Sequence, residues 1–296
     1  MIHPTSGFVT KLLACMVVLA FAIVSHAQES GQLVPYKSFQ SKFVDSREVD
    51  VWLPPGYNQN SSAKYPVLYM HDGQNLFDPH LSYTGVPWGV DKAIARLSSE
   101  GKIRAAIVVG IWNTPKRFGE YMPQKAVSVT NTAQLPGIPI PTHDEIVSDN
   151  YLKFIVEELK PFIDAHYRTL PGRADTFIMG SSMGGLISAY AVAEYPKVFG
   201  GAACLSTHWP IADGAVVTYL RAHLPDPNTH RFYFDHGTAT LDAQYAPYQD
   251  RMDAAMEAAG YTEGKNWISR TYSGADHSER SWNARIDVPL QFLLGL

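Results

Sequence analysis

The chain has 296 residues, of which 46% are hydrophobic and 18% are charged, and its formal net charge at pH 7 is −4. This hydrophobic fraction is enough to bury a full core, and the length allows one large domain or two average ones. No stripe of Lys and Arg is present, so the charge pattern excludes the electrostatic footprint of a nucleic-acid-binding protein. We therefore expect no nucleic-acid partner.

Residues 1–27 have the pattern of a signal peptide. Lys11 precedes an apolar run at residues 12–24, and Ala27 ends a Ser-His-Ala tripeptide of the kind that a signal peptidase cleaves. Because the run is short for a membrane span, we expect cleavage after Ala27, a periplasmic or secreted product, and no stable membrane insertion afterwards. The alternatives are a lipoprotein signal with Cys15 as the lipidated residue, and an uncleaved anchor.

The predicted elements alternate between strands and helices along the chain. Apolar runs predict strands at residues 38–45, 47–53, 65–70, 105–112, 174–179, 200–206, 231–235 and 267–273. Helical spacing of apolar residues predicts helices at residues 88–99, 149–167, 183–195, 211–223, 244–260 and 279–294. Residues 28–35 are expected to form a flexible lead-in, and Pro161 to kink the second helix or mark a boundary near its end. The alternation predicts an α/β fold over residues 28–296, with a mostly parallel sheet flanked by helices on both faces.

Residues 113–145 interrupt this alternation. Prolines occur at positions 115, 123, 136, 139 and 141, so no long regular element fits there. Long irregular segments in compact domains are often lids or binding loops, and we interpret this one as an insertion over the carboxyl edge of the sheet. The alternative is a mobile excursion with no role.

The most informative motif is G-x-S-x-G, formed by Gly180, Ser182 and Gly184 between a predicted strand and a predicted helix. In that context the motif marks a nucleophile elbow, a sharp turn that presents a serine at the end of the sheet. We therefore predict Ser182 as a nucleophile and expect a side chain at Gly180 or Gly184 to crowd the turn. The alternative is a Gly/Ser-rich turn that only caps the helix.

A serine hydroxyl needs a base, and the base needs an acid that orients it. His277, in the loop after the last predicted strand, is the best-placed base. The chain order Ser…Asp…His leaves Asp235 and Asp242 as candidate acids, and this order cannot choose between them. Asp276, beside His277, is expected to point elsewhere.

From about Arg47 to its C-terminus the chain resembles the putative-esterase branch of the α/β-hydrolase fold. The resemblance is carried by motifs at residues 69–78, 117–123, 158–161, 167–169, 180–185 and 274–277. This branch includes feruloyl and acetylxylan esterases, S-formylglutathione hydrolase, siderophore-trilactone esterases and mycolyltransferases. The resemblance implies a serine carboxylic ester hydrolase that uses no cofactor.

The resemblance also implies roles for particular residues. Family members often carry the acid a few residues beyond a Gly-Thr pair, which favours Asp242, although the longer spacing here leaves Asp235 open. Alignment of Gly73 with the glycine of the family's His-Gly turn makes the Gln74 N–H one donor to the oxyanion. Met183, which follows the nucleophile, supplies the other.

The start of the insertion faces the active site in the family, so Arg117 and Tyr121 are expected to bind the substrate. The alternative is an internal ion pair between Arg117 and Glu120. His208, after the sixth predicted strand, is expected either to line the pocket or to be a packed or solvated loop histidine. No metal site is expected, because no metal-binding motif supports a cluster of His71, Asp72, Asp78 and His80.

These observations predict an exported serine esterase in which Ser182 attacks an ester carbonyl and an acyl-enzyme is then hydrolysed. The expected substrate is a small-molecule or oligosaccharide ester, such as an acylated sugar or a siderophore ester. One alternative is an acyltransferase with the same triad. The other is a catalytically silent hydrolase fold that binds carbohydrate or a partner protein. The sequence leaves the oligomeric state open.

Overall fold

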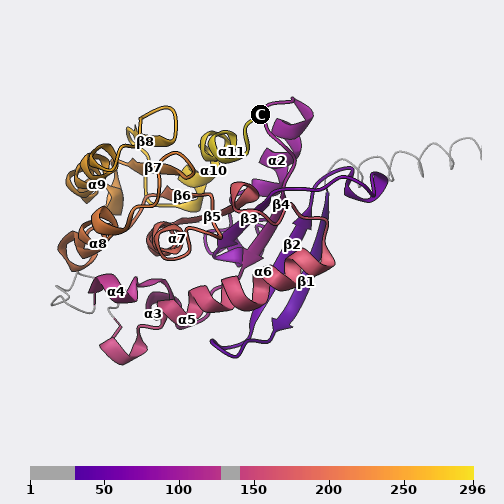
Figure 1. Ribbon diagram of the computed structural model, residues 1–296, viewed down its shortest axis with the longest axis horizontal. Coiled ribbons are helices and arrows are strands. Elements are labelled where there is room, and N and C mark those ends of the chain that lie inside the picture. Colours follow the sequence, from indigo (N-terminus) through magenta and orange to yellow (C-terminus); the bar gives the residue numbers. More distant parts are fainter. Residues whose placement is uncertain (1–30, 128–140) are drawn as a thin grey trace, which may run out of the picture.

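The computed structural model describes residues 31–127 and 141–296, so the predicted signal peptide and the middle of the insertion lie outside it. Within the described residues, one eight-stranded sheet has the order β1-β2-β4-β3-β5-β6-β7-β8 (Figure 1). From β4 to β8 neighbouring strands are parallel, whereas β2 is antiparallel to both of its neighbours. Parallel neighbours need crossover connections, and most of these contain helices.

The observed elements follow the predicted alternation, which confirms the α/β-hydrolase-like fold. The strands are β1 (Gln32–Phe39), β2 (Arg47–Leu53), β3 (Val67–His71), β4 (Ile107–Ile111), β5 (Thr176–Ser181), β6 (Gly201–Leu205), β7 (Arg231–Gly237) and β8 (Trp267–Tyr272). The α-helices are α2 (Val90–Ser99), α3 (Arg117–Tyr121), α4 (Gln124–Val127), α5 (Ser148–Lys153), α6 (Lys160–His166), α7 (Met183–Glu194), α8 (Ala215–His223), α9 (Ala246–Ala258), α10 (Glu279–Asn283) and α11 (Asp287–Leu294).

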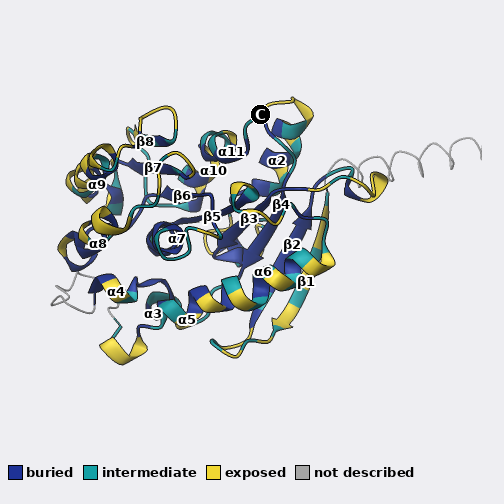
Figure 2. Cartoon of the chain, in the orientation of Figure 1, coloured by how far each residue is buried: buried dark blue, intermediate teal, exposed yellow. Residues whose placement is uncertain are grey.

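The sheet separates two hydrophobic cores. Successive residues of a strand point to opposite faces, so Val67 and Tyr69 of β3 enter one core while Leu68 and Met70 enter the other. Helices α3 to α9 pack against the first face, and α2, α10 and α11 pack against the second (Figure 1). Figure 2 shows the central strands buried and the exposed residues on the outer sides of the helices.

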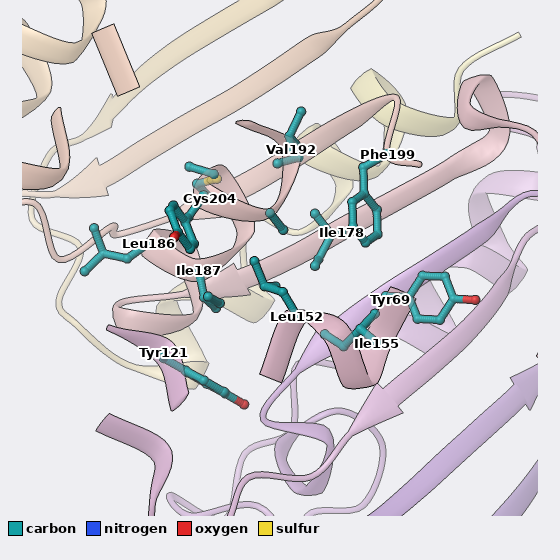
Figure 3. Close-up of a cluster of buried hydrophobic side chains, with 14 of the residues drawn as sticks. Tyr69, Tyr121, Leu152, Ile155, Ile178, Leu186, Ile187, Val192, Phe199 and Cys204 are labelled. Atoms are coloured by element: carbon teal, nitrogen blue, oxygen red, sulfur yellow. The ribbon is translucent and has the colours of Figure 1, made fainter. Parts of the chain in front are cut away.

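Helix α7 is buried along most of its length and has no polar face, as expected for a helix that lies inside a core. Its residues Leu186 and Ile187 belong to the same core cluster as Tyr121 of α3 and Leu152 of α5 (Figure 3). The N-terminus of α7 directly follows Ser182, so the packing of this helix holds the predicted nucleophile in a rigid frame.

The first strand differs from the prediction. β1 spans Gln32–Phe39 and pairs with β2, whereas residues 38–45 were expected to be the strand and residues 28–35 a lead-in. The Ser41 hydroxyl accepts hydrogen bonds from the N–H groups of Phe43 and Val44. Such local side-chain bonds compete with strand pairing and turn the chain at this point.

The helix predicted at residues 149–167 is divided. Between α5 and α6 the residues Phe154–Leu159 form a wider π-helical turn, just before Pro161. Proline has no N–H to donate to the carbonyl four residues back, so the irregularity appears beside it. The described part of the insertion forms the short helices α3 and α4 and the 3-10 turn His143–Glu145. No helix in the described ranges is both long and apolar enough to cross a membrane.

Candidate active site

The predicted site residues lie in loops beyond the carboxyl ends of the parallel strands. Gln74 follows β3, Ser182 follows β5, and His208 follows β6, while Asp242 and His277 follow β7 and β8. Because parallel strands end at one edge of the sheet, residues far apart in sequence meet there.

The turn at Ser182 has the strained geometry of a nucleophile elbow. Ser182 has φ 58° and ψ −121°, and its N–H donates to the Leu205 carbonyl at 2.9 Å. A Cβ at Gly180 would lie 2.8 Å from the Gly184 carbonyl carbon, so residue 180 must be glycine. A Cβ at Gly184 would meet its nearest atom at 3.4 Å, an ordinary contact, so the crowding expected there is absent.

The structure brings Asp242 and His277 together. His277 Nδ1 lies 2.5 Å from Asp242 Oδ1. The backbone N–H of His277 donates to the Thr240 hydroxyl at 3.0 Å. The second carboxylate oxygen of Asp242 accepts hydrogen bonds from the Ser206 hydroxyl and the Gly237 N–H, both at 2.6 Å. Burial alone would raise the pKa of Asp242, but the hydrogen bonds from His277, Ser206 and Gly237 outweigh it and hold this pKa below its usual value.

The other candidate acid is committed elsewhere. Asp235 is fully buried and accepts hydrogen bonds from Arg285 Nε and Nη2, at 3.1 and 2.9 Å. The Tyr233 hydroxyl donates to the same carboxylate at 2.8 Å. Asp276 pairs with Arg280 and accepts from Ser278 and Ser281, so its carboxylate is also occupied. Of these three aspartates, the side chain of Asp242 is the one that bonds to His277.

Tyr245 interacts with the nucleophile and two histidines, and no sequence pattern indicated it. Its hydroxyl hydrogen-bonds to Nδ1 of His208 at 2.6 Å. Burial raises the pKa of Tyr245 well above its usual value, and the Ser182 side chain acts in the opposite direction. Its ring stands edge-on to that of His277, with 5.8 Å between centroids. No motif distinguishes this tyrosine from the other aromatic residues around it, because the contact depends on how the loop after β7 folds.

His208 is 1% exposed, and its Nε2 has no hydrogen-bond partner within the described residues. Burial lowers its pKa to about 4, and the nearby charges of His277 and Arg117 act in the same direction. The imidazole is therefore neutral at neutral pH, and it packs behind Tyr245.

Each of the two predicted oxyanion donors lies in the first turn of a helix, one in a short 3-10 turn and the other in α7. Met183 is the first residue of α7, where a helix leaves its N–H groups without internal partners. Gln74 lies in the 3-10 turn Gly73–Asn75, which follows Asp72. A Cβ on Gly73 would lie 2.7 Å from the Gly110 carbonyl carbon, so the turn can approach β4 this closely only with glycine.

Arg117 pairs with Asp72 and not with Glu120. Its Nε and Nη2 donate to the two carboxylate oxygens of Asp72, each at 2.7 Å. Glu120 instead accepts from Arg47 at 2.6 and 2.9 Å, in a fully buried pair. The expected alternative of an Arg117–Glu120 pair is therefore wrong, because each residue has found a different partner. The guanidinium outweighs burial and holds the pKa of the Asp72 carboxyl below its usual value.

Tyr121 also lies differently from the expectation that it faces the substrate. Its side chain is fully buried in the core (Figure 3). The Tyr121 hydroxyl accepts the N–H of Asp72 at 3.3 Å, and the Arg117 guanidinium lies 5.0 Å from the ring centroid. Tyr121 therefore packs on the core side of Asp72 and Arg117, and its own side chain is not accessible to a substrate.

The four residues considered for a metal do not gather at one point. His71 Nδ1 lies 2.8 Å from the Tyr151 hydroxyl, and burial lowers the pKa of His71 to about 3. Asp78 accepts the N–H of His80, and Asp72 is paired with Arg117. In the part of the chain that the structure describes, no three His, Cys, Asp or Glu side chains are grouped to hold a metal ion.

Known proteins resemble this chain over most of its length. Residues 41–293 match the family described as "Putative esterase". The uncharacterized protein YbbA of Bacillus subtilis is 21% identical over 271 residues, which are 90% of this chain and 97% of that protein. An endo-1,4-beta-xylanase/feruloyl esterase of Xylanibacter ruminicola is 23% identical over 247 residues. That match covers 82% of this chain but only 29% of the relative.

Among solved structures, a ferulic acid esterase superposes with a TM-score of 0.64 and 19% identity. The match covers 90% of this chain and 98% of the esterase. At this identity the likeness shows a shared fold.

Proposed function

The chain belongs to the Putative esterase family and is a carboxylic ester hydrolase, and we propose that it works as a serine esterase with Ser182, His277 and Asp242 as its catalytic triad. The observation that carries the proposal is the 2.5 Å hydrogen bond between His277 Nδ1 and Asp242 Oδ1. This bond places the imidazole proton on Nδ1 and leaves Nε2 to accept the proton of a nucleophile. The strained backbone of Ser182 supports the same assignment.

In the proposed reaction, the Ser182 hydroxyl attacks the ester carbonyl while His277 Nε2 takes its proton. The N–H groups of Gln74 and Met183 bind the oxyanion of the tetrahedral intermediate. When the intermediate collapses, the alcohol leaves with the proton from His277 and an acyl-enzyme remains. Water then attacks the acyl-enzyme, again with His277 as the base, and the carboxylic acid leaves as Ser182 is restored.

We propose that the substrate is an acylated sugar or a related natural ester. The feruloyl esterase among the relatives and the ferulic acid esterase fold support this class. Arg117 uses Nε and Nη2 for its ion pair, and we assign its Nη1 to a polar group of the substrate. His208, packed against Tyr245, would hold that side chain in place, and Tyr121 would do the same for Arg117.

Export is part of the proposal. The charged start, the apolar run and the small residues that end at Ala27 support removal of residues 1–27, so that the mature chain begins at Gln28.

Replacement of Ser182 by Ala tests the proposed function. We expect kcat for p-nitrophenyl acetate to fall by roughly 10⁴-fold or more, since triad members act as a unit. Ser181→Ala, at the neighbouring position, is the matched control and should retain most of the activity. A serine-directed phosphonate should label Ser182 alone. Labelling of Ser181, or an active Ser182→Ala variant, would contradict the assignment.

The same purified protein can be assayed with acetylated, feruloylated and trilactone esters to identify the acyl and alcohol parts. Addition of a sugar acceptor separates the hydrolase from the alternative acyltransferase: a hydrolase releases free acid at an unchanged rate, whereas a transferase forms a new ester.

A further inference from the structure

We propose that Ser206 is a positioning residue, whose hydroxyl holds the Asp242 carboxylate in the orientation that faces His277. This inference rests on the proposed function, in which Asp242 is the acid of the triad. It adds a residue that no motif indicates.

The backbone at Ser206 is held in an unfavourable conformation. Ser206 follows β6, is fully buried and has φ 40°, a region that favours glycine. Its N–H is bound by the Asp235 carbonyl at 2.8 Å and lies 3.2 Å from Asp235 Oδ1. Glycine would adopt this conformation with less strain, and what serine adds at this position is its hydroxyl.

The hydrogen bonds around the Ser206 hydroxyl fix its direction. A hydroxyl has two acceptor sites and one proton. Trp282 Nε1 and Arg285 Nη2 both point at Oγ, at 3.0 and 2.8 Å, and neither group can accept a hydrogen bond. The two acceptor sites are therefore filled, and the one proton is left for Asp242 Oδ2, at 2.6 Å.

The buried ion pair between Arg285 and Asp235 fixes one of the two donors to the Ser206 hydroxyl. Arg285 is 4% exposed and holds Asp235 through Nε and Nη2. The Asp235 carboxylate thus balances the positive charge of Arg285. The Ser206 hydroxyl connects this guanidinium to the Asp242 carboxylate. Trp282 joins the hydroxyl to the base as well, because its ring stands edge-on to His277 with 5.1 Å between centroids.

The hydroxyl should also tune the basicity of His277. Hydrogen bonds stabilise the negative charge of Asp242, so they limit how strongly this carboxylate favours a proton on His277. The other polar groups near the His277 ring do not oppose this effect of Asp242 on His277. Tyr245 and the neutral His208 carry no charge, and Asp276 is paired with Arg280.

The test compares Ser206→Gly with Ser206→Ala. Both variants remove the hydroxyl, but glycine accepts the positive φ whereas alanine keeps the strain, so the two should differ in melting temperature. We expect both to lower kcat about ten- to hundredfold with KM little changed, the loss expected for a hydrogen bond to a charged group. The acidic limb of the pH–rate profile should move to higher pH in both.

If Ser206 had only a structural role, its variants would lose kcat only to the extent that their melting temperature fell. The proposal is therefore overturned if Ser206→Gly keeps the wild-type kcat and pH profile, even where Ser206→Ala unfolds. It is also overturned if the acidic limb stays in place in both variants.

Asp242→Asn separates this inference from the proposed triad. An active Asp242→Asn enzyme would refute the triad itself. If that variant is inactive as expected, adding Ser206→Gly to it should cost less than threefold more, because both changes act through one carboxylate. A further tenfold loss in the double variant would show that Ser206 acts elsewhere, while leaving the triad standing.

Discussion

Replacing Asp242 by Asn probes how the acid orients the base. The carboxylate receives one hydrogen bond on Oδ1, from His277, and two on Oδ2, from Ser206 and Gly237. Asparagine has the same shape, but an NH₂ group must replace one of the oxygens. Since two donors face Oδ2 and one faces Oδ1, we expect the amide oxygen at the Oδ2 position and the NH₂ group against His277.

In this orientation the amide donates to His277 Nδ1, so the imidazole proton moves to Nε2. A ring protonated on Nε2 cannot accept the proton of Ser182, and kcat should fall by up to about 10⁴-fold. The two hydrogen bonds to the Oδ2 position survive and the bond to His277 is reversed, so only the charge is lost and the free energy of unfolding at neutral pH should fall by only about 1 kcal/mol.

The pH dependence of stability gives a second signature. The folded pKa of Asp242 lies below its ordinary value, so its carboxylate stabilises the fold above that ordinary value. This contribution disappears as the pH falls through the folded pKa. The stability difference between the native chain and Asp242→Asn should therefore shrink in acid.

Asp235→Asn should have the opposite effect. Arg285 donates to both oxygens of Asp235, so an amide in either orientation turns its NH₂ group against an Arg285 N–H. Arg285 is then left buried without a counter-charge, which costs about 3–5 kcal/mol. At about 2–4 °C per kcal/mol, the melting temperature should fall by roughly 6–20 °C. Burial raises the pKa of Asp235, so its charge is costly in itself, and we expect the lower end of this range.

The assay is kcat with p-nitrophenyl acetate, together with the melting temperature followed by circular dichroism, for both variants. We expect Asp242→Asn to be stable and inactive, and Asp235→Asn to be destabilised with a smaller loss of kcat. An inactive but stable Asp235→Asn, beside an active Asp242→Asn, would refute the reasoning and make Asp235 the acid.

Two further predictions concern the substrate and the N-terminus. Arg117→Ala should raise KM for a bulky feruloylated sugar much more than for a small acetyl ester, because only the larger substrate reaches Nη1. Equal effects on both substrates, with a lower melting temperature, would show that Arg117 acts only through its ion pair with Asp72. N-terminal sequencing of the exported protein should begin at Gln28, and an acylated Cys15 at the mature start would make it a lipoprotein instead.

Some tertiary contacts could not be predicted because the partners are chosen in three dimensions. Arg117 and Glu120 lie one helical turn apart, which made them the obvious pair. In the fold, β3 brings Asp72 to Arg117 and β2 brings Arg47 to Glu120. The arrangement of the strands in the sheet, and not the spacing of the residues along the chain, decided both ion pairs.

The sequence by itself determined the features that depend on short-range order. Apolar periodicity predicted the alternating strands and helices, and the motif around Ser182 predicted a strained turn between β5 and α7, because both arise within a few residues. Only the tertiary structure decided which aspartate bonds to His277. Asp235 and Asp242 both follow the start of β7, but the strand turns Asp235 toward Arg285 from the C-terminal helical region, whereas the loop beyond Gly237 carries Asp242 back to His277. Ser206 and Tyr245 entered the site for the same reason: parallel strands end at one edge and gather side chains that no local pattern links.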